Sequence, residues 1–142
     1  MHVDQAGLDM ILVGDSVGMT EMGYSSTLPV NLEDTILFSK CVSRYGLRLF
    51  LKHSGAKYPL IIGDMPFGSY EESISQCIHN CIRLTKEGGV DGVKLEGGVR
   101  RQKEAKALTD CGIAVMGHIG LTPQSVNVLG GFKIQGKSCI GN

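Results

Sequence analysis

The sequence predicts an α/β protein built from parallel β-α-β units. Four short runs of β-forming residues each end in one ionisable residue followed by a turn, and the longer segments between them carry helix signals. Strands and helices that alternate in this way pack most economically as parallel strands joined by right-handed crossovers. Four such units fit either a small open sheet or half of a (β/α)8 barrel, which needs about 250 residues. Periodicity alone leaves both architectures open.

The bulk composition indicates one domain over residues 1–142. The chain is 42% hydrophobic, enough for a single core, and its 14 basic residues balance 14 acidic ones. This balance gives no electrostatic case for binding nucleic acid or an anionic membrane. No apolar run approaches the roughly 20 residues of a membrane span, and residues 1–5 lack the regions of a signal peptide. We expect a cytoplasmic location, or a mitochondrial one if a eukaryotic N-terminal segment is missing.

The cysteines are predicted to be reduced thiols, because their number is odd and they show no zinc-type pairing. Cys77 and Cys81 share one face of a predicted helix, whereas His79 points roughly 200° away. Core packing is therefore favoured over a metal site at these three residues.

The first strand covers residues 11–14 and reads as buried on both faces. The segment 17–30 contains Pro29 and turn residues, which favour an irregular loop over a helix. Asn31 then has the side chain of a helix N-cap, with two acids in the first turn. The apolar stripe expected on this helix consists of Leu32, Ile36, Leu37 and Cys41.

Residues 45–57 fit neither helical nor strand periodicity, because basic residues interrupt the apolar ones. We interpret this segment as an insertion or irregular loop. A solvent-exposed loop with basic side chains is favoured over a loop that binds a partner.

The second strand covers residues 60–63 and leads to Asp64. Ser69 and Glu72 have capping-box spacing, so a helix is predicted to follow. Its apolar positions recur at helical spacing and it ends at a pair of glycines; these residues are Ile74, Cys77, Ile78, Cys81, Ile82, Gly88 and Gly89.

The third strand covers residues 93–96 and the fourth covers 113–117, where His118 follows. Between them a helix is predicted around residues 101–111, with Ala105, Leu108 and Cys111 facing inward. Residues 119–142 are expected to form a long functional loop with one short helix.

Asp15, Asp64, Glu96 and His118 lie at the ends of the four strands, so they should meet at one edge of the sheet. Three carboxylates in a partly buried space repel one another unless a cation lies among them, and oxygen ligands suit Mg²⁺ better than zinc. Any one of these acids alone would more often be a solvated loop residue or a helix cap, but the whole set at equivalent positions predicts an active site.

Two more residues belong to this predicted site. Lys94 lies two residues before Glu96 and so projects from the same face, where it needs a carboxylate or an anionic substrate as partner. Ser16 adds a donor at the rim. The glycine pairs 88–89, 97–98 and 130–131 match neither a P-loop nor a dinucleotide fingerprint, so tight turns are the better interpretation.

With these residues considered, the sequence resembles the ketopantoate hydroxymethyltransferase (3-methyl-2-oxobutanoate hydroxymethyltransferase) family. The matching segments follow the family's order and cover most of the chain outside 45–57; they are residues 12–19, 26–29, 64–67, 93–98, 117–125 and 129–133.

The resemblance implies a (β/α)8 barrel, usually in a large homo-oligomer, that uses Mg²⁺ and 5,10-methylenetetrahydrofolate. It implies that Asp15 and Asp64 hold the metal, with Glu96 in or just behind its coordination shell. The implied contacts to the 2-oxo acid substrate come from Asp15, Asp64, Ser16 and Lys94, with a hydrogen bond from His118. The implied reaction adds a hydroxymethyl group to 3-methyl-2-oxobutanoate and gives 2-dehydropantoate for pantothenate synthesis, through an enolate that Mg²⁺ stabilises.

The resemblance also implies that the chain holds about strands two to five of the eight. Residues 138–142 diverge from the family, and the general base is expected beyond Asn142, so the chain alone is expected to be inactive. Two alternatives stay open. One is a Mg²⁺-dependent C–C lyase or mutase of the phosphoenolpyruvate mutase and isocitrate lyase type, and the other is a catalytically dead assembly subunit.

Overall fold

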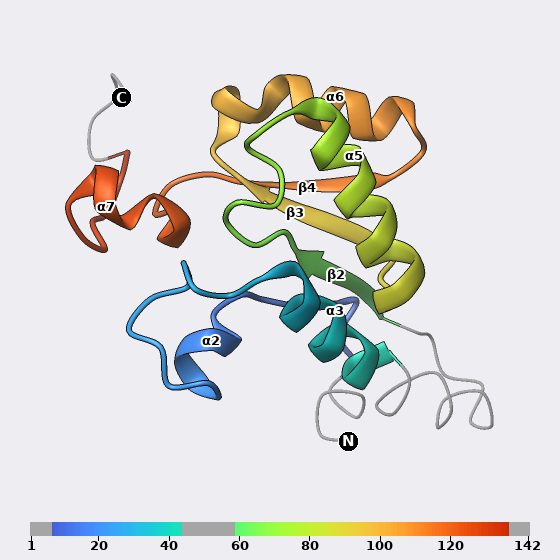
Figure 1. Ribbon diagram of the computed structural model, residues 1–142, viewed down its shortest axis with the longest axis horizontal. Coiled ribbons are helices and arrows are strands. Elements are labelled where there is room, and N and C mark those ends of the chain that lie inside the picture. The colour runs from blue at the N-terminus through green and yellow to red at the C-terminus, as the bar shows by residue number, and fades with distance from the viewer. Residues whose placement is uncertain (1–6, 44–58, 137–142) are drawn as a thin grey trace.

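The computed structural model describes residues 7–43 and 59–136, and in this part four parallel strands form one sheet (Figure 1). The strands are β1 (Met10–Val13), β2 (Leu60–Asp64), β3 (Gly92–Glu96) and β4 (Ala114–His118). They lie in the order β1-β2-β3-β4, so each pairs in parallel with its neighbour in sequence. The predicted α/β class and all four strands are confirmed.

Three longer helices follow the first three strands and lie along one face of the sheet (Figure 1). They are α3 (Leu32–Cys41), α5 (Ile74–Arg83) and α6 (Gln102–Asp110). A π-helical turn, η2 (Leu84–Gly88), continues α5 and stops at Gly89, whose positive φ of 71° suits glycine. A 3-10 turn, η3 (Gly98–Arg101), leads into α6.

Short helical turns gather at the end of the sheet toward which the strands point (Figure 1). They are α2 (Val17–Thr20), the 3-10 turn η4 (Pro123–Ser125) and α7 (Val126–Leu129). The prediction that segment 17–30 contains no helix was therefore wrong. Its first four residues form the single helical turn α2, which has Ser16 as its N-cap and ends well before Pro29. The single short helix predicted after residue 119 is present, extended by the preceding 3-10 turn.

The core lies between the sheet and the helices. Side chains that alternate along the strands, such as Ile61, Val93 and Leu95, pack against Leu84 and Leu108, and all are at most 2% exposed. At Gly63 an added Cβ would lie 2.9 Å from Leu84 Cδ2, so the missing side chain lets the helical layer approach the sheet closely.

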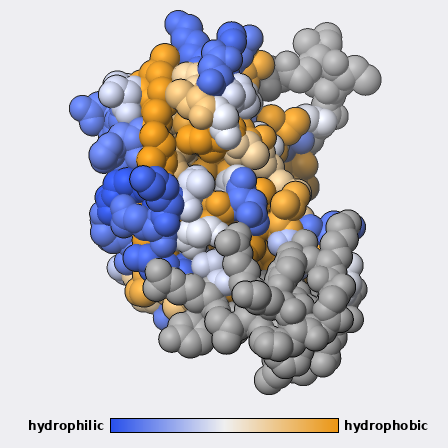
Figure 2. All heavy atoms as spheres, turned by 90° about the vertical axis from the view of Figure 1, so that its right-hand side faces the viewer, coloured by the Kyte–Doolittle hydropathy of each residue, from blue (hydrophilic) through white to orange (hydrophobic). Residues whose placement is uncertain are grey.

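The other face of the sheet, the open face, is uncovered where β1 and β2 begin in the described part of the chain, whereas positions nearer the strand ends, such as Ile62 and Lys94, are buried. Met10, Leu12 and Leu60 share this face by strand register and are 41%, 47% and 52% exposed. Figure 2 looks at the end from which the strands start, where hydrophobic side chains reach the surface between hydrophilic ones. The prediction that the first strand is buried on both faces was wrong, because only Ile11 and Val13 point toward α3.

The two predicted helix starts have different outcomes. Asn31 caps α3 in a full capping box, with its side chain accepting from the Asp34 amide at 2.9 Å and Asp34 accepting from the Asn31 amide. The capping box at Ser69 and Glu72 was wrong. Ser73 is the N-cap of α5, and the Ser69 hydroxyl donates instead to the Pro66 carbonyl within the preceding turn.

Some of the positions predicted to face inward on α3 and α6 were wrong. Leu37, Cys41 and Cys111 are exposed, whereas Thr35 and Ser39 are buried. Ser39 faces η2 at a place where an added Cβ on Gly88 would come within 3.0 Å of the Ser39 Cβ, so this contact accommodates only small side chains. Apolar periodicity cannot detect such a contact.

The predictions for Cys77 and Cys81 are confirmed, because both are fully buried in the core and His79 is exposed. The predicted loop at 45–57 and the divergent tail at 138–142 lie outside the described residues. In the part of the chain that the structure describes, no helix combines the length and the apolar character needed to cross a membrane.

Candidate metal centre

Three buried carboxylates meet where the strands end. Asp15 follows β1, and Asp64 and Glu96 are the last residues of β2 and β3. One oxygen from each lies within 4.8 Å of the others, and the three residues are 3%, 0% and 4% exposed. The predicted convergence of these acids is confirmed.

Strand register explains the positions of the other two ionisable side chains at the site. Asp64 lies opposite Lys94 in the ladder, and the Lys94 Nζ is 2.7 Å from Asp64 Oδ2. Glu96 lies opposite His118, and the His118 Nδ1 is 3.1 Å from Glu96 Oε1. The buried lysine therefore has a carboxylate partner, one of the two partners that the sequence allowed.

One oxygen of Asp64 has no protein partner among the described residues. Oδ2 accepts from the Lys94 ammonium and from the Asp15 amide, whereas Oδ1 is buried without a hydrogen bond. A buried carboxylate oxygen without a donor is costly unless a cation or water satisfies it. This atom belongs to a residue that lies in a cluster with two further carboxylates, a donor set that fits a hard divalent cation such as Mg²⁺.

The electrostatics of the cluster agree with this fit. The pKa of Asp64 is raised from 3.8 to about 7, first by burial and then by the nearby Asp15 carboxylate, while Lys94 offsets only part of the rise. Burial also raises the pKa of Glu96, against the opposing effects of the Gln124 amide and His118. The positive groups nearby therefore do not balance the negative charge of the three carboxylates. A divalent cation would balance the rest.

The sequence prediction missed Gln124 and Tyr70, which join the site from η4 and from the loop after β2. Gln124 Nε2 donates to Asp15 Oδ2 at 2.8 Å, and its backbone amide donates to Glu96 Oε2 at 3.1 Å. The Tyr70 hydroxyl donates to Gln124 Oε1 at 2.6 Å. Gln124 lies within the motif at 117–125, but an uncharged amide gave no separate signal of a role.

Ser16 lies at the rim of the site as predicted. It is exposed, and it occupies the N-cap position of α2 without a side-chain cap hydrogen bond. Gly14 precedes Asp15, and a Cβ there would lie 3.2 Å from Ser16 Oγ and 3.8 Å from Asp64 Oδ2. The absence of a side chain at Gly14 thus keeps space open between the rim and the carboxylates.

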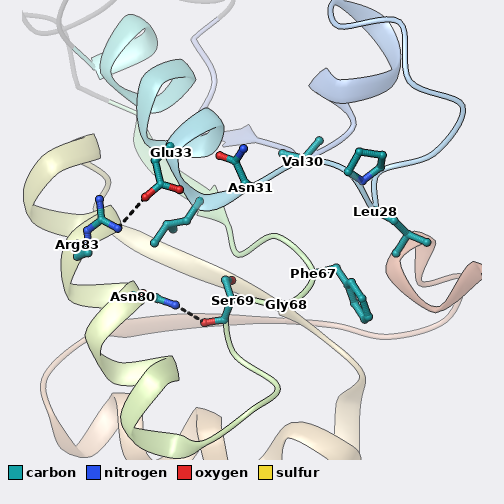
Figure 3. A pocket seen from close by; sticks show the side chains of 11 residues that line it. Leu28, Val30, Asn31, Glu33, Phe67, Gly68, Ser69, Asn80 and Arg83 are labelled. Atoms are coloured by element: carbon teal, nitrogen blue, oxygen red, sulfur yellow. Dashed lines mark hydrogen bonds and ion pairs between the residues drawn. The ribbon is translucent and has the colours of Figure 1, made fainter.

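A separate surface pocket of about 360 Å³ lies between α3, α5 and the loop after β2 (Figure 3). Its polar groups pair with one another: Arg83 with Glu33 at 2.9 Å, and the Asn80 amide with the Ser69 carbonyl at 2.7 Å. Because these contacts are already satisfied, the pocket does not compete with the carboxylate cluster as the reactive site.

Comparison with known proteins gives the family. The model of the family described as ketopantoate hydroxymethyltransferase matches residues 1–140. The chain belongs to this family. Its site residues Asp15, Asp64, Lys94, Glu96 and His118 all lie within the matched range.

Curated relatives agree with the family. The chain is 48% identical over 139 residues to 3-methyl-2-oxobutanoate hydroxymethyltransferase 1, mitochondrial, of Arabidopsis thaliana, covering 97% of this chain and 37% of that protein. It is 52% identical over 134 residues to 3-methyl-2-oxobutanoate hydroxymethyltransferase of Alkaliphilus metalliredigens, covering 94% and 44%. The chain thus spans less than half the length of these relatives.

Proposed function

We propose that this chain carries the metal and 2-oxo acid half of a hydroxymethyltransferase site. The reaction would transfer a hydroxymethyl group from 5,10-methylenetetrahydrofolate to 3-methyl-2-oxobutanoate and give 2-dehydropantoate, a step in pantothenate synthesis. The observation that carries the proposal is the buried Oδ1 of Asp64, which has no hydrogen-bond partner among residues 7–43 and 59–136 and belongs to a cluster of three carboxylates. The names of the relatives supply the reaction type.

Asp15 and Asp64 would hold Mg²⁺, with Glu96 in or just behind its coordination shell. Each oxygen of the Glu96 carboxylate already has a protein partner, His118 Nδ1 at Oε1 and the Gln124 amide at Oε2, which favours the outer role for this residue. When bound, Mg²⁺ supplies a Lewis acid that withdraws electron density from a chelated 2-oxo acid.

The chain's own cations and donors would bind and orient the substrate. Lys94 is 8% exposed and holds a positive charge beside Asp64, where an anionic substrate would share it. The Nδ1 of His118 faces Glu96, so Nε2 is left to donate to or accept from a ligand. Ser16 would supply a hydroxyl to the substrate carboxylate from the rim.

The open sheet face fits a larger architecture, in which these four strands form part of an eight-stranded barrel. The general base would then come from residues outside this chain, and the assembled enzyme would be a homo-oligomer. We therefore expect no turnover from the 142-residue chain alone. A cytoplasmic or mitochondrial location stays a prediction from the sequence, although plant relatives carry the word mitochondrial in their names.

Calorimetry on the 142-residue chain tests the half-site directly. Titration with MgCl₂ should show one site, and 3-methyl-2-oxobutanoate should bind measurably only when Mg²⁺ is present. Asp64→Asn should weaken Mg²⁺ binding by at least about 100-fold, since it removes a charged ligand. Asp110→Asn, on the exposed surface of α6, is the matched control and should leave binding unchanged.

Equal Mg²⁺ affinity in the wild type and Asp64→Asn would refute the metal assignment. Turnover with methylenetetrahydrofolate by the isolated chain would refute the expected inactivity. Release or rearrangement of a 2-oxo acid without tetrahydrofolate would favour the C–C lyase or mutase alternative.

A further inference from the structure

Gln124 is the residue that connects the carboxylates from opposite sides of the site. Its side-chain Nε2 donates to Asp15 Oδ2 and to the Met65 carbonyl, both at 2.8 Å, which uses both of its hydrogens. Its backbone amide donates to Glu96 Oε2 at 3.1 Å. One residue, 5% exposed, therefore contacts two of the three acids and the backbone directly after the third.

The orientation of this amide is fixed by Tyr70. The Tyr70 hydroxyl, on a side chain that is 1% exposed, donates to Gln124 Oε1 at 2.6 Å. If the amide flipped, Nε2 would face the Tyr70 oxygen and Oε1 would face both the Asp15 carboxylate and the Met65 carbonyl. Two acceptor–acceptor contacts make that arrangement unfavourable, so the donor stays directed at Asp15.

The hydrogen bonds from Gln124 also determine which carboxylate oxygens remain for a cation. Asp15 Oδ2 is engaged by Gln124, and Asp64 Oδ2 is engaged by Lys94 and the Asp15 amide. Among the described residues, the oxygens of these two carboxylates that have no hydrogen bond are Asp15 Oδ1 and the buried Asp64 Oδ1. The amide thus divides the Asp15 carboxylate into one oxygen held by protein and one available as a ligand.

We propose that Gln124 is the positioning residue of the metal centre and that Tyr70 acts on the centre through it. Gln124 holds the Asp15 carboxylate in the rotamer that presents one oxygen to the ion and holds Glu96 through its backbone amide. This inference rests on the proposed metal site. It assigns Gln124, in the segment after β4, an effect on metal affinity that is exerted through Asp15 and Glu96 and not as a ligand.

Metal titration of four variants tests the proposal in the full 142-residue chain. Gln124→Met keeps the shape but removes the amide, and it should weaken Mg²⁺ binding by roughly 10- to 100-fold, as is usual for residues that orient metal ligands. Tyr70→Phe should weaken it by roughly 3- to 10-fold, because it removes the 2.6 Å hydrogen bond to Gln124 and a longer one of 3.4 Å that the hydroxyl accepts from the Glu96 amide. In the double variant Tyr70→Phe should add less than about twofold, because its effect passes through Gln124. Gln102→Met, on the exposed start of α6, is the matched control and should bind as the wild type does.

A second readout separates positioning from a general loss of structure. Electron paramagnetic resonance of bound Mn²⁺ reports the symmetry of its ligands, and it should change in Gln124→Met and Tyr70→Phe at temperatures where circular dichroism shows both fully folded. A role in stability alone would lower the melting temperature and leave this spectrum unchanged. If Gln124→Met does not fold, Gln124→Asn replaces it, because it keeps the amide but moves it one methylene away from Asp15.

The outcomes for the two proposals are distinguishable. If the wild type binds neither Mg²⁺ nor Mn²⁺, the proposed metal site fails. If the wild type binds, and the Gln124 variants match Gln102→Met in affinity and spectrum, the positioning role is overturned. An additive effect of Tyr70→Phe in the double variant overturns the route through Gln124.

Discussion

The two faces of the sheet differ in what their side chains do. One face is covered by α3, α5 and α6, and it carries a continuous apolar core. The other face carries apolar side chains near the start of the strands and the charged cluster near their ends. Because side chains alternate along a strand, the neighbouring residues Gly63 and Asp64 lie on different faces. Gly63 contributes to packing, and Asp64 belongs to the carboxylate cluster.

This contrast indicates that alternate residues of the same strand serve different purposes: those on the covered face stabilise the fold, and those at the end of the open face form the proposed reactive site. The covered face is closely packed; at Gly63, for example, the missing side chain leaves just enough room for Leu84 of η2. The charged end of the open face instead holds carboxylates whose pKa values are raised by burial, an arrangement that costs folding free energy when no metal is bound. Substitutions on the covered face should therefore lower the free energy of unfolding, whereas substitutions in the charged cluster should mainly change Mg²⁺ binding and the pH dependence of stability.

The largest predicted effect is on the covered face. Leu84→Ala should lower the free energy of unfolding by about 2 to 5 kcal/mol, because it removes a fully buried side chain and leaves a cavity against Gly63. Leu60→Ala, on the open face, is the control and should cost no more than about 1 kcal/mol. Urea unfolding measures both. Equal losses would show that the open face is packed as tightly as the covered one.

The next effect is a pH dependence that originates on the open face. The raised pKa of Asp64, about 7 in the folded chain against 3.8 ordinarily, makes the folded state hold a proton that the unfolded chain releases. The stability from this proton is fully present below pH 3.8 and is lost as pH rises through about 7, at about 1.4 kcal/mol per unit of pKa difference.

Asp64→Asn provides the comparison for this prediction. In EDTA, the unfolding free energy of the wild type minus that of the variant should fall by a few kcal/mol between pH 4 and 8, at about 1.4 kcal/mol per pKa unit. Saturating Mg²⁺ should reverse the trend in the wild type, because the metal binds the ionised carboxylate. Parallel pH profiles in EDTA would contradict the assigned shift.

A smaller effect is expected where the covered face begins. Asn31→Ala removes the capping box of α3 and should lower stability by about 1 kcal/mol, with no change in Mg²⁺ affinity of the folded chain. Asn127→Ala, at an exposed position of α7, is a matched substitution that should change little. Thermal melts with and without Mg²⁺ give both quantities, and a loss of affinity in Asn31→Ala would link the two faces more closely than we expect.

The smallest effect is expected on the outer surface of the helical layer. Lys106→Ala breaks an exposed ion pair with Asp110 on α6 and should cost no more than about 0.5 kcal/mol. Lys103→Ala on the same helix serves as the control. A loss above about 1 kcal/mol would show that this surface is covered in solution, since exposed pairs rarely contribute that much.

Much of the fold could be predicted from the sequence, because the four strands end in the same kind of signal. Each apolar run stops at a polar residue and a turn, and this fixed their number and parallel direction. The open face of β1 could not be predicted, since Met10 and Leu12 are apolar whether or not anything covers them. The start of α5 was misplaced because Ser69 and Ser73 both precede an acceptor at capping distance, and only the preceding turn decides between them.

The ionisable part of the site was predictable for a related reason. Parallel strands bring their carboxyl ends to one edge of the sheet, so the sequence alone predicts that Asp15, Asp64 and Glu96 lie together. Gln124 and Tyr70 escaped prediction because their role depends on hydrogen-bond direction across 54 residues of sequence. Periodicity and charge carry no information about such a contact.

The hydrogen bond between Gln124 and Asp15 joins residues 109 positions apart. Contacts of such long range form late in folding, because the chain between them must first be ordered. During synthesis, the carboxylates emerge from the ribosome in the order Asp15, Asp64 and Glu96, and the amide that orients them emerges last. A cation would then meet an oriented Asp15 only after η4 has formed, and Mg²⁺ should slow unfolding of the finished chain more than it speeds folding.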